Sequence, residues 1–151
     1  MSRPVPPVTH EVARRFGVGP VIGGEDVAEL PQEAGAYVLI MELKRPVEVP
    51  VRRLGNPVFT PGVYLYCGSA RGPGGLSARV TRHLRTEKKQ RWHVDYLSSK
   101  AYGIAALPIT GGNECDLVSR LMAVFPVEFP VAGFGSSDCR RCISHLMRLP
   151  G

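Results

Sequence analysis

Residues 61–85, with the sequence PGVYLYCGSARGPGGLSARVTRHLR, constrain the fold more than any other part of the chain. Alternation over residues 63–67 predicts a β-strand, and Gly68 begins a loop rich in glycine and small residues. Apolar residues at every fourth position then predict an amphipathic helix over residues 76–85, which is also strongly basic. Loop N–H groups and helix N-termini attract anions, and arginine forks hold phosphate oxygens. The segment therefore predicts a phosphate-binding site.

The regular segments on either side predict a small α+β fold. The run GAYVLIMEL, from residue 35, has few polar interruptions and predicts a strand buried on both faces. Residues 101–110 predict a third core strand, and residues 111–125 predict a second long helix. We therefore expect a small, mainly antiparallel, three-stranded core sheet flanked by helices.

The remaining segments are less regular. Residues 44–62 contain alternating valines interrupted by prolines, which predicts a strand or hairpin arm on a sheet edge. Residues 86–100 predict a polar turn followed by a short helix or an extended piece. Residues 1–30, with their early prolines and a short helix from Thr9, are expected to form an N-terminal extension to a domain spanning residues 31–151.

Charge is distributed unevenly along the chain, whose net charge is +6. Residues 1–50 contain five basic and seven acidic side chains, whereas residues 51–151 contain fourteen basic and six acidic ones. Such asymmetry points to a polyanion, most simply nucleic acid, although a basic face that only aids solubility is the alternative. The chain has no apolar run long enough for a membrane span and no signal-peptide pattern, which predicts a cytoplasmic protein with reduced cysteines.

Five sequence elements, in order, resemble the GIY-YIG nuclease superfamily. Gly35-Ala36-Tyr37 matches the first motif of that family, and Tyr66-Cys67-Gly68 matches the second. Arg79 with His83, and later Glu114, match the helix arginine, the histidine that follows it and the metal-binding glutamate. The match is closer to a branch of largely uncharacterised prokaryotic domains that are sometimes fused to endonuclease III-type glycosylases. It covers residues 30–149.

The chain also departs from the family pattern. Residues 44–60 form an insertion between the two tyrosine motifs, and residues 72–75 lengthen the loop before Arg79. Ser69 stands where the repair nucleases often have lysine, and Arg71 is a candidate replacement for that charge. Homology alone does not establish activity.

The resemblance implies a catalytic set of Tyr37, Tyr66, Arg79, His83 and Glu114. Glu114 would hold one divalent ion, and a carboxylate suits Mg²⁺ or Mn²⁺. Tyr66 would activate or orient the attacking water, with help from Tyr37, and Arg79 would stabilise charge on the phosphate. His83 lies one helical turn from Arg79 and would move a proton or contact phosphate.

Each of these residues also has a plainer interpretation. The tyrosines could be core aromatics with satisfied hydroxyls, and Tyr64 shares a strand face with Tyr66. Arg79 could be a solvated helix residue. Glu114 could merely complement the helix N-terminus, and Asp116 is a rival for its function.

The basic segment and its surroundings provide candidate nucleic-acid contacts. These are Ser69, Arg71, Arg82, Arg85, Lys88, Lys89, Trp92 and His93. Trp92 and Tyr96 could stack on unpaired bases, or they could form a packed aromatic clamp beneath the sheet. If the segment is extended, Asp95 would share a face with His93 and orient its imidazole.

The C-terminal segment predicts a metal site. Cys139, Cys142 and His145 follow one another at three-residue intervals and fit part of a zinc site. Structural zinc normally takes four ligands, and Cys115 or Cys67 would serve only if the fold brings one of them near. The alternative is that these side chains are buried or capping residues. In the branch that the chain resembles, this motif looks integral to the domain, which implies that Ser137, Asp138 and His145 border the cleft.

Three functional hypotheses follow. The first is a metal-dependent endonuclease acting on DNA, including branched or damaged DNA, in repair or processing, with a repair protein as a further partner. The second is a non-catalytic nucleic-acid-binding module that retains the nuclease fold. The third is a structural or partner-binding domain whose tail is a metal knuckle. For the first we expect low intrinsic sequence specificity, because few residues lie outside the core.

Overall fold

A four-stranded antiparallel sheet forms the centre of the molecule in a computed structural model, which describes residues 3–17, 19–135 and 142–150. The strand order is β5-β1-β4-β6, and each neighbouring pair is antiparallel. The strands are β1 (Gly35–Leu43), β4 (Gly62–Ala70), β5 (Gly103–Thr110) and β6 (Leu146–Leu149). The predicted α+β class is therefore confirmed.

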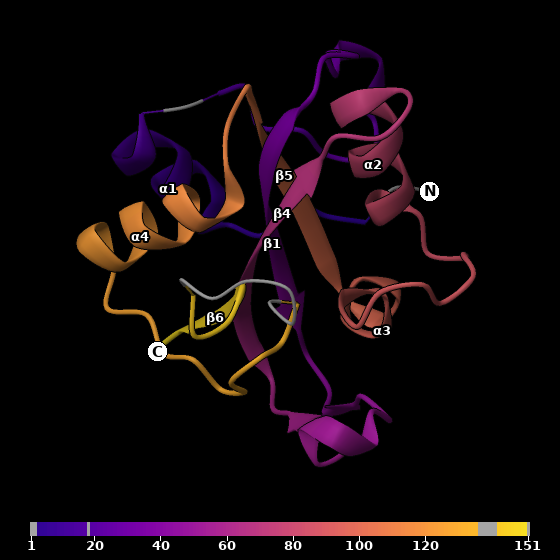
Figure 1. Cartoon of the computed structure of the whole chain (residues 1–151), viewed down its shortest axis with the longest axis vertical. Helices are drawn as coiled ribbons and strands as arrows, with labels where there is room; N and C mark the ends of the chain where they lie inside the picture. Colours follow the sequence, from indigo (N-terminus) through magenta and orange to yellow (C-terminus); the bar gives the residue numbers. More distant parts are fainter. Residues whose placement is uncertain (1–2, 18, 136–141, 151) are drawn as a thin grey trace.

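Helices cover both faces of this sheet (Figure 1). On one face lie α1 (Thr9–Phe16) and α4 (Glu114–Val124), and on the other lie α2 (Gly75–Leu84) and α3 (Val94–Lys100). Two 3₁₀ turns, η1 (Val27–Glu29) and η2 (Arg52–Leu54), lie in the connections.

Strand β1 is buried on both sides because it lies between these two layers. Tyr37, Leu39 and Met41 belong to the core under α2 and α3. The residues between them, such as Val38 and Ile40, belong to the core under α4. This alternation follows the two-residue period of a strand, and a strand covered on both faces needs apolar residues at both sets of positions.

The sheet differs from the prediction at its edges. The three predicted strands are β1, β4 and β5, but residues 146–149 of the tail add β6 beside β4. Residues 44–61 lie outside the main sheet. They form the separate two-stranded sheet of β2 (Val47–Glu48) and β3 (Val58–Phe59). Both differences depend on pairing between distant segments, which short periodic patterns do not encode.

The residues predicted to form an N-terminal extension pack against the remainder of the chain. Helix α1 buries Val12 and Phe16 in the core shared with α4. Ile22 forms an antiparallel bridge with Ala106, next to the edge strand β5. The guanidinium of Arg3 donates to backbone carbonyls at the ends of α2 and α3. Of these contacts, the Ile22–Ala106 bridge covers part of the outer edge of β5.

Within residues 3–17, 19–135 and 142–150, no helix has the length and apolarity needed to cross a bilayer.

Candidate active site

A polar cleft of about 380 Å³ opens beside the α2–α3 layer. Its walls come from β1, β4, α2, the segment before α3, the start of α4 and the segment before β6. It is lined by Tyr37, Arg53, Tyr66, Gly68, Ser69, Arg79, His83, Arg91, Trp92, His93, Glu114, Gly135 and His145. All five residues of the predicted catalytic set are therefore brought together in one cleft.

The two motif tyrosines lie on neighbouring strands and point to the same side of the sheet. Tyr37 is opposite Gly68, and Tyr66 is opposite Leu39 in the β1–β4 register. The rival Tyr64 lies in the same core but donates its hydroxyl to the carbonyl of Thr60, 2.6 Å away. Tyr64 is thus held by the turn before β4 and is not among the residues that line the cleft.

Gly68 makes room for the Tyr37 side chain. A Cβ atom at this position would overlap the Tyr37 phenol. The Tyr37 hydroxyl instead reaches the Nε2 atom of His83 on α2 at 2.7 Å. The glycine of the second motif is therefore needed for the contact between the first motif and the helix.

Burial keeps both cleft tyrosines protonated. It raises the pKa of Tyr66 above its usual value, and the nearby Arg79 lowers it only in part. Burial likewise raises the pKa of Tyr37, and the proximity of Tyr66 adds to this shift. Neutral phenols donate one hydrogen bond and accept others, so both groups can orient a water molecule.

His83 is a neutral imidazole at neutral pH. Burial, together with the nearby Lys88, lowers its pKa to about 3. Its Nδ1 atom lies 3.8 Å from Oδ1 of Asp95, which is beyond hydrogen-bond distance. The negative carboxylate nevertheless favours a proton on Nδ1, which leaves Nε2 to accept from the Tyr37 hydroxyl.

Asp95 supports α2 and α3 rather than His93, because the segment is helical and the extended conformation that a His93–Asp95 pair would need is not formed. Its carboxylate is fully buried and forms a two-pronged ion pair with Arg82, with both N–O distances at 2.9 Å. Burial raises the pKa of Asp95, but Arg82 and two backbone N–H groups outweigh that effect and the net pKa is lowered. Because α3 begins at Val94, positions 93 and 95 do not share a face as they would in an extended segment.

Arg79 enters the cleft from the first half of α2. The helix starts at Gly75, where φ is +54° and a Cβ atom would overlap backbone oxygens of residues 32 and 33. Arg79 donates to the carbonyl of Ser69 at 3.1 Å, and its guanidinium lies 4.3 Å from the centre of the Trp92 ring. These contacts hold the arginine while its remaining N–H groups stay available for an anion.

Glu114 is the first residue of α4 and lines the cleft. Asn113 caps the helix by accepting from the backbone N–H groups of Cys115 and Asp116. The Oε2 atom of Glu114 is buried and has no hydrogen-bond partner among the described residues. A buried carboxylate oxygen without a partner is costly unless a cation or water neutralises it. Its rival Asp116 is exposed and does not line the cleft.

The predicted nucleic-acid contacts separate into two groups. Ser69, Trp92 and His93 line the cleft, and the Trp92 ring is covered by the Arg79 and Arg82 guanidiniums at 4.3 and 4.5 Å. The packed clamp therefore describes Trp92 well. The other side chains lie outside the cleft lining: Arg71, Arg82, Arg85, Lys88 and Lys89.

Three of those outlying basic residues have structural partners, and one of them is Arg82, which pairs with Asp95. The Lys88 ammonium donates to carbonyls at the end of α2, including His83 at 2.8 Å and Arg85 at 3.0 Å. Burial lowers the pKa of Lys88 to about 8. Arg71 is exposed and donates to the carbonyl of Gly112 at 2.8 Å.

The cleft contains two arginines that sequence reasoning did not select. Arg53 belongs to η2, within the insertion between the tyrosine motifs, and Arg91 precedes α3. The Arg52-Arg53 pair within the insertion was the available signal for the first. Together with Arg79 they give the cleft a positive excess over Glu114.

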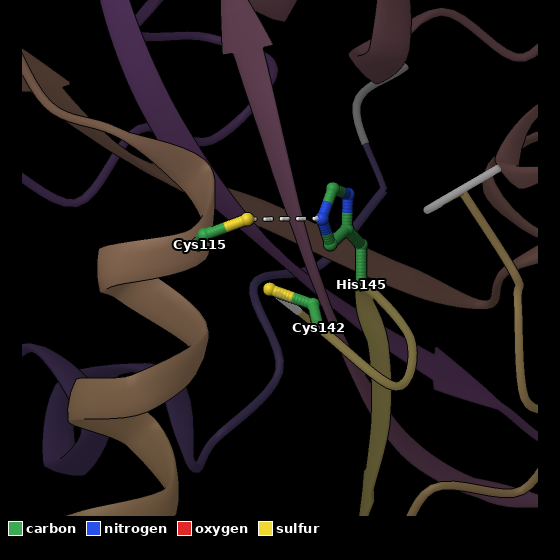
Figure 2. Close-up of side chains that lie close together, drawn as sticks. All are labelled: Cys115, Cys142 and His145. Carbon is green, nitrogen blue, oxygen red and sulfur yellow. Dashed lines mark hydrogen bonds between the residues drawn. The ribbon is translucent and has the colours of Figure 1, made fainter. Parts of the chain in front are cut away.

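Cys115, Cys142 and His145 form a second group beside the cleft (Figure 2). Their ligand atoms all lie within 4.8 Å of one another, so this group could hold a metal ion. His145 also lines the cleft, as expected from the family resemblance. Cys139, predicted as a ligand, lies outside the described residues, as do Ser137 and Asp138. Cys67 is not part of the group within the described residues.

Comparison with known proteins gives one match. A family model described as "Domain of unknown function DUF123" covers residues 36–151. The chain belongs to this DUF123 family. The matched range contains every residue of the cleft. No curated protein and no solved structure matches the chain.

Proposed function

We propose that this DUF123 protein is a GIY-YIG-type endonuclease that hydrolyses phosphodiester bonds of DNA with a divalent cation. The observation that supports this most strongly is the buried, unpartnered Oε2 atom of Glu114, which lies in a cleft with Arg79, Tyr37 and Tyr66. One anionic donor facing several N–H and O–H groups is the arrangement that a cation and a phosphate together would complete.

Glu114 would hold the cation, and its hard carboxylate oxygen fits Mg²⁺ or Mn²⁺. When bound, such an ion supplies Lewis-acid polarisation of the phosphate and of water. Because Mg²⁺ keeps several waters and substrate oxygens as ligands, one protein carboxylate is enough. The donor chemistry of Cys115, Cys142 and His145 suits zinc instead, so the two metal sites would be chemically distinct.

Tyr66 and Tyr37 would orient the attacking water as neutral phenols. Because burial raises the pKa of both, hydrogen bonding rather than phenolate basicity is their contribution in the resting protein. With the proton of His83 on Nδ1, the Tyr37 hydroxyl would donate to Nε2 and keep an acceptor lone pair for the water. Asp95 acts through His83 by favouring the tautomer that accepts this bond.

The arginines would bind and neutralise the phosphate. Arg79 lies closest to the tyrosines, as its effect on the pKa of each indicates, and would stabilise charge that develops on the scissile phosphate. Arg53 and Arg91 line the same cleft and would hold neighbouring phosphates. Contacts to phosphates do not read bases, so low sequence specificity follows.

The second candidate is a DNA-binding module without catalysis. The observation that favours it is the protonation state of the cleft, since Tyr37 and Tyr66 are phenols and His83, with a pKa of about 3, is a weak base. We nevertheless favour hydrolysis, because a pure binding site has no need of a carboxylate with a buried, unpartnered oxygen in a cleft lined by arginines. We propose cytoplasmic DNA as the substrate, including branched or damaged DNA met during repair, with a repair protein as partner.

The test compares cleavage by the wild type, Glu114→Gln and Asp116→Asn. Labelled duplex, nicked, branched and single-stranded DNA, and matched RNA, are incubated with Mg²⁺ or Mn²⁺. We expect cleavage by the wild type and by Asp116→Asn, and a loss of about 100-fold or more in Glu114→Gln. Retained DNA binding with no cleavage of any substrate would contradict hydrolysis and favour the binding module.

A further inference from the structure

Cys115, Cys142 and His145 come from two distant parts of the chain and converge on one point (Figure 2). Cys115 lies in the first turn of α4, whereas Cys142 and His145 lie in the segment that leads into β6. Cys115 is 6% exposed and His145 is 5% exposed. Cys142 is partly exposed, so two sulfurs and an imidazole nitrogen are gathered at a site that is buried on the Cys115 and His145 side and open to solvent at Cys142.

The spacing of these atoms fits tetrahedral zinc. Zinc–sulfur and zinc–nitrogen bonds of about 2.3 and 2.1 Å place neighbouring ligand atoms about 3.6–3.8 Å apart. The Cys115 sulfur lies 3.7 Å from Nε2 of His145, and all three ligand atoms lie within 4.8 Å of one another. Contraction of less than about 1 Å would bring the widest pair to that spacing.

The backbone holds both sides of the group in place. The Asn113 side chain caps α4 through the N–H of Cys115 at 2.9 Å. On the other side, the backbone of His145 donates to Phe134 at 3.0 Å and accepts from Cys67 at 2.9 Å. The site is therefore organised by contacts that do not involve the three ligand side chains, as zinc-binding geometry requires.

We propose that Cys115, Cys142 and His145 bind one zinc ion, which cross-links the start of α4 to the segment before β6. Two thiolates and an imidazole are soft and borderline donors, which favour zinc over Mg²⁺. The ion is separate from the hard cation proposed at Glu114, and its binding does not depend on any reaction with DNA. Because Cys115 follows Glu114 directly and His145 lines the cleft, the zinc fixes one wall of the cleft.

The experiment measures metal bound by the full chain in the absence of DNA. Protein purified with a reductant and without chelator is expected to contain one equivalent of zinc by elemental analysis. Cobalt exchanged for zinc is expected to give a sulfur-to-cobalt charge-transfer band. Excess Mg²⁺ should not displace the metal. Zinc added to the stripped protein at a hundredfold excess over its Kd should raise Tm by about 5–10 °C.

Matched variants test the ligand set. Cys115→Ser is expected to lose at least about tenfold in zinc affinity and to weaken the cobalt charge-transfer band. Cys67→Ala and Glu114→Gln remove neighbouring residues outside the group and should each retain one equivalent of zinc. If Cys115→Ser does not fold, the cobalt band and the Tm shift of the wild type still show whether the protein binds the metal through sulfur. A wild type that takes up neither zinc nor cobalt would overturn the proposal, as would equal zinc loss in Cys67→Ala. Loss of cleavage in Glu114→Gln with zinc retained keeps this test separate from that of the nuclease.

Discussion

The two faces of the sheet share the same strands but differ in the kinds of side chain that they bury. On the α1–α4 face, strand residues such as Val38, Ile40 and Leu65 pack against aliphatic helix residues. On the α2–α3 face, the same strands present Tyr37 and Tyr66 to a cleft that also contains ionisable groups. The first face is packed mainly with apolar side chains, whereas the second also buries His83 and Asp95 and leaves the Oε2 atom of Glu114 without a hydrogen-bond partner among the described residues.

This difference shows where stability and function are separated in a small fold. Because side chains alternate along a strand, one face can be packed for stability while the other keeps costly groups. Buried polar groups that lack a partner lower stability, and they persist where a ligand satisfies them. Packing on the α1–α4 face therefore offsets the free-energy cost of the cleft. Substitutions on that face should lower stability without lowering activity, whereas substitutions in the cleft should lower activity.

The largest effect on stability is expected on the aliphatic face. Leu121 belongs to α4, and its side chain is fully buried in the core of this face. Leu121→Ala should lower the free energy of unfolding by about 2–5 kcal/mol. Urea denaturation measures this, with Met122→Ala, at a position that is 49% exposed, as the matched control. Cleavage per folded molecule should stay unchanged. A loss of cleavage per folded molecule in Leu121→Ala would contradict the separation of stability and function between the two faces.

The next effect is expected from a single methyl group in the cleft. A Cβ atom in Gly68→Ala would overlap the Tyr37 phenol and push it from His83. Displacement of a positioned catalytic group by about 1 Å costs about 100-fold in rate. Single-turnover cleavage measures the loss, and Gly19→Ala, at an exposed glycine with no heavy atom within 4 Å of an added Cβ, serves as the control. Unchanged cleavage in Gly68→Ala would show that the Tyr37–His83 contact is dispensable.

A smaller effect is expected from pH. The unfolded chain protonates His83 near pH 6.5, whereas the folded protein resists protonation down to a pKa of about 3. Between these values the unfolded state binds more protons, so this histidine makes stability fall as the pH falls below about 6.5. The stability of His83→Gln should therefore decline less than that of the wild type between pH 7 and pH 4, in urea titrations at each pH. The exposed His10→Gln should follow the wild type, and parallel curves for all three proteins would contradict the buried neutral imidazole.

The sequence predicted the parts of the molecule that depend on local pattern. Strands β1 and β4 and helix α2 follow directly from apolar periodicity and glycine breaks. The clustering of Tyr37, Tyr66, Arg79, His83 and Glu114 could be expected from the family resemblance, and the cleft brings those residues together.

The contacts between distant segments could not be predicted from pattern. Asp95 pairs with Arg82 rather than His93 because α3 begins at Val94. A four-residue segment of the tail forms β6 by pairing with β4. Cys115 was one of two candidates to join the tail cysteines, and only the packing of α4 selects it. Each of these outcomes depends on tertiary packing rather than on local periodicity.

The most direct test of the account separates catalysis from binding at Arg79. Single-turnover cleavage and DNA affinity at fixed salt are measured for the wild type, Arg79→Ala and Arg85→Ala, the last changing an exposed arginine on the same basic segment outside the cleft. We predict that Arg79→Ala slows cleavage by about 100-fold or more while weakening DNA binding less than about tenfold. Arg85→Ala should weaken binding modestly and leave the cleavage step unchanged. An equal loss of cleavage and binding in Arg79→Ala would contradict a catalytic cleft and leave a binding surface in its place.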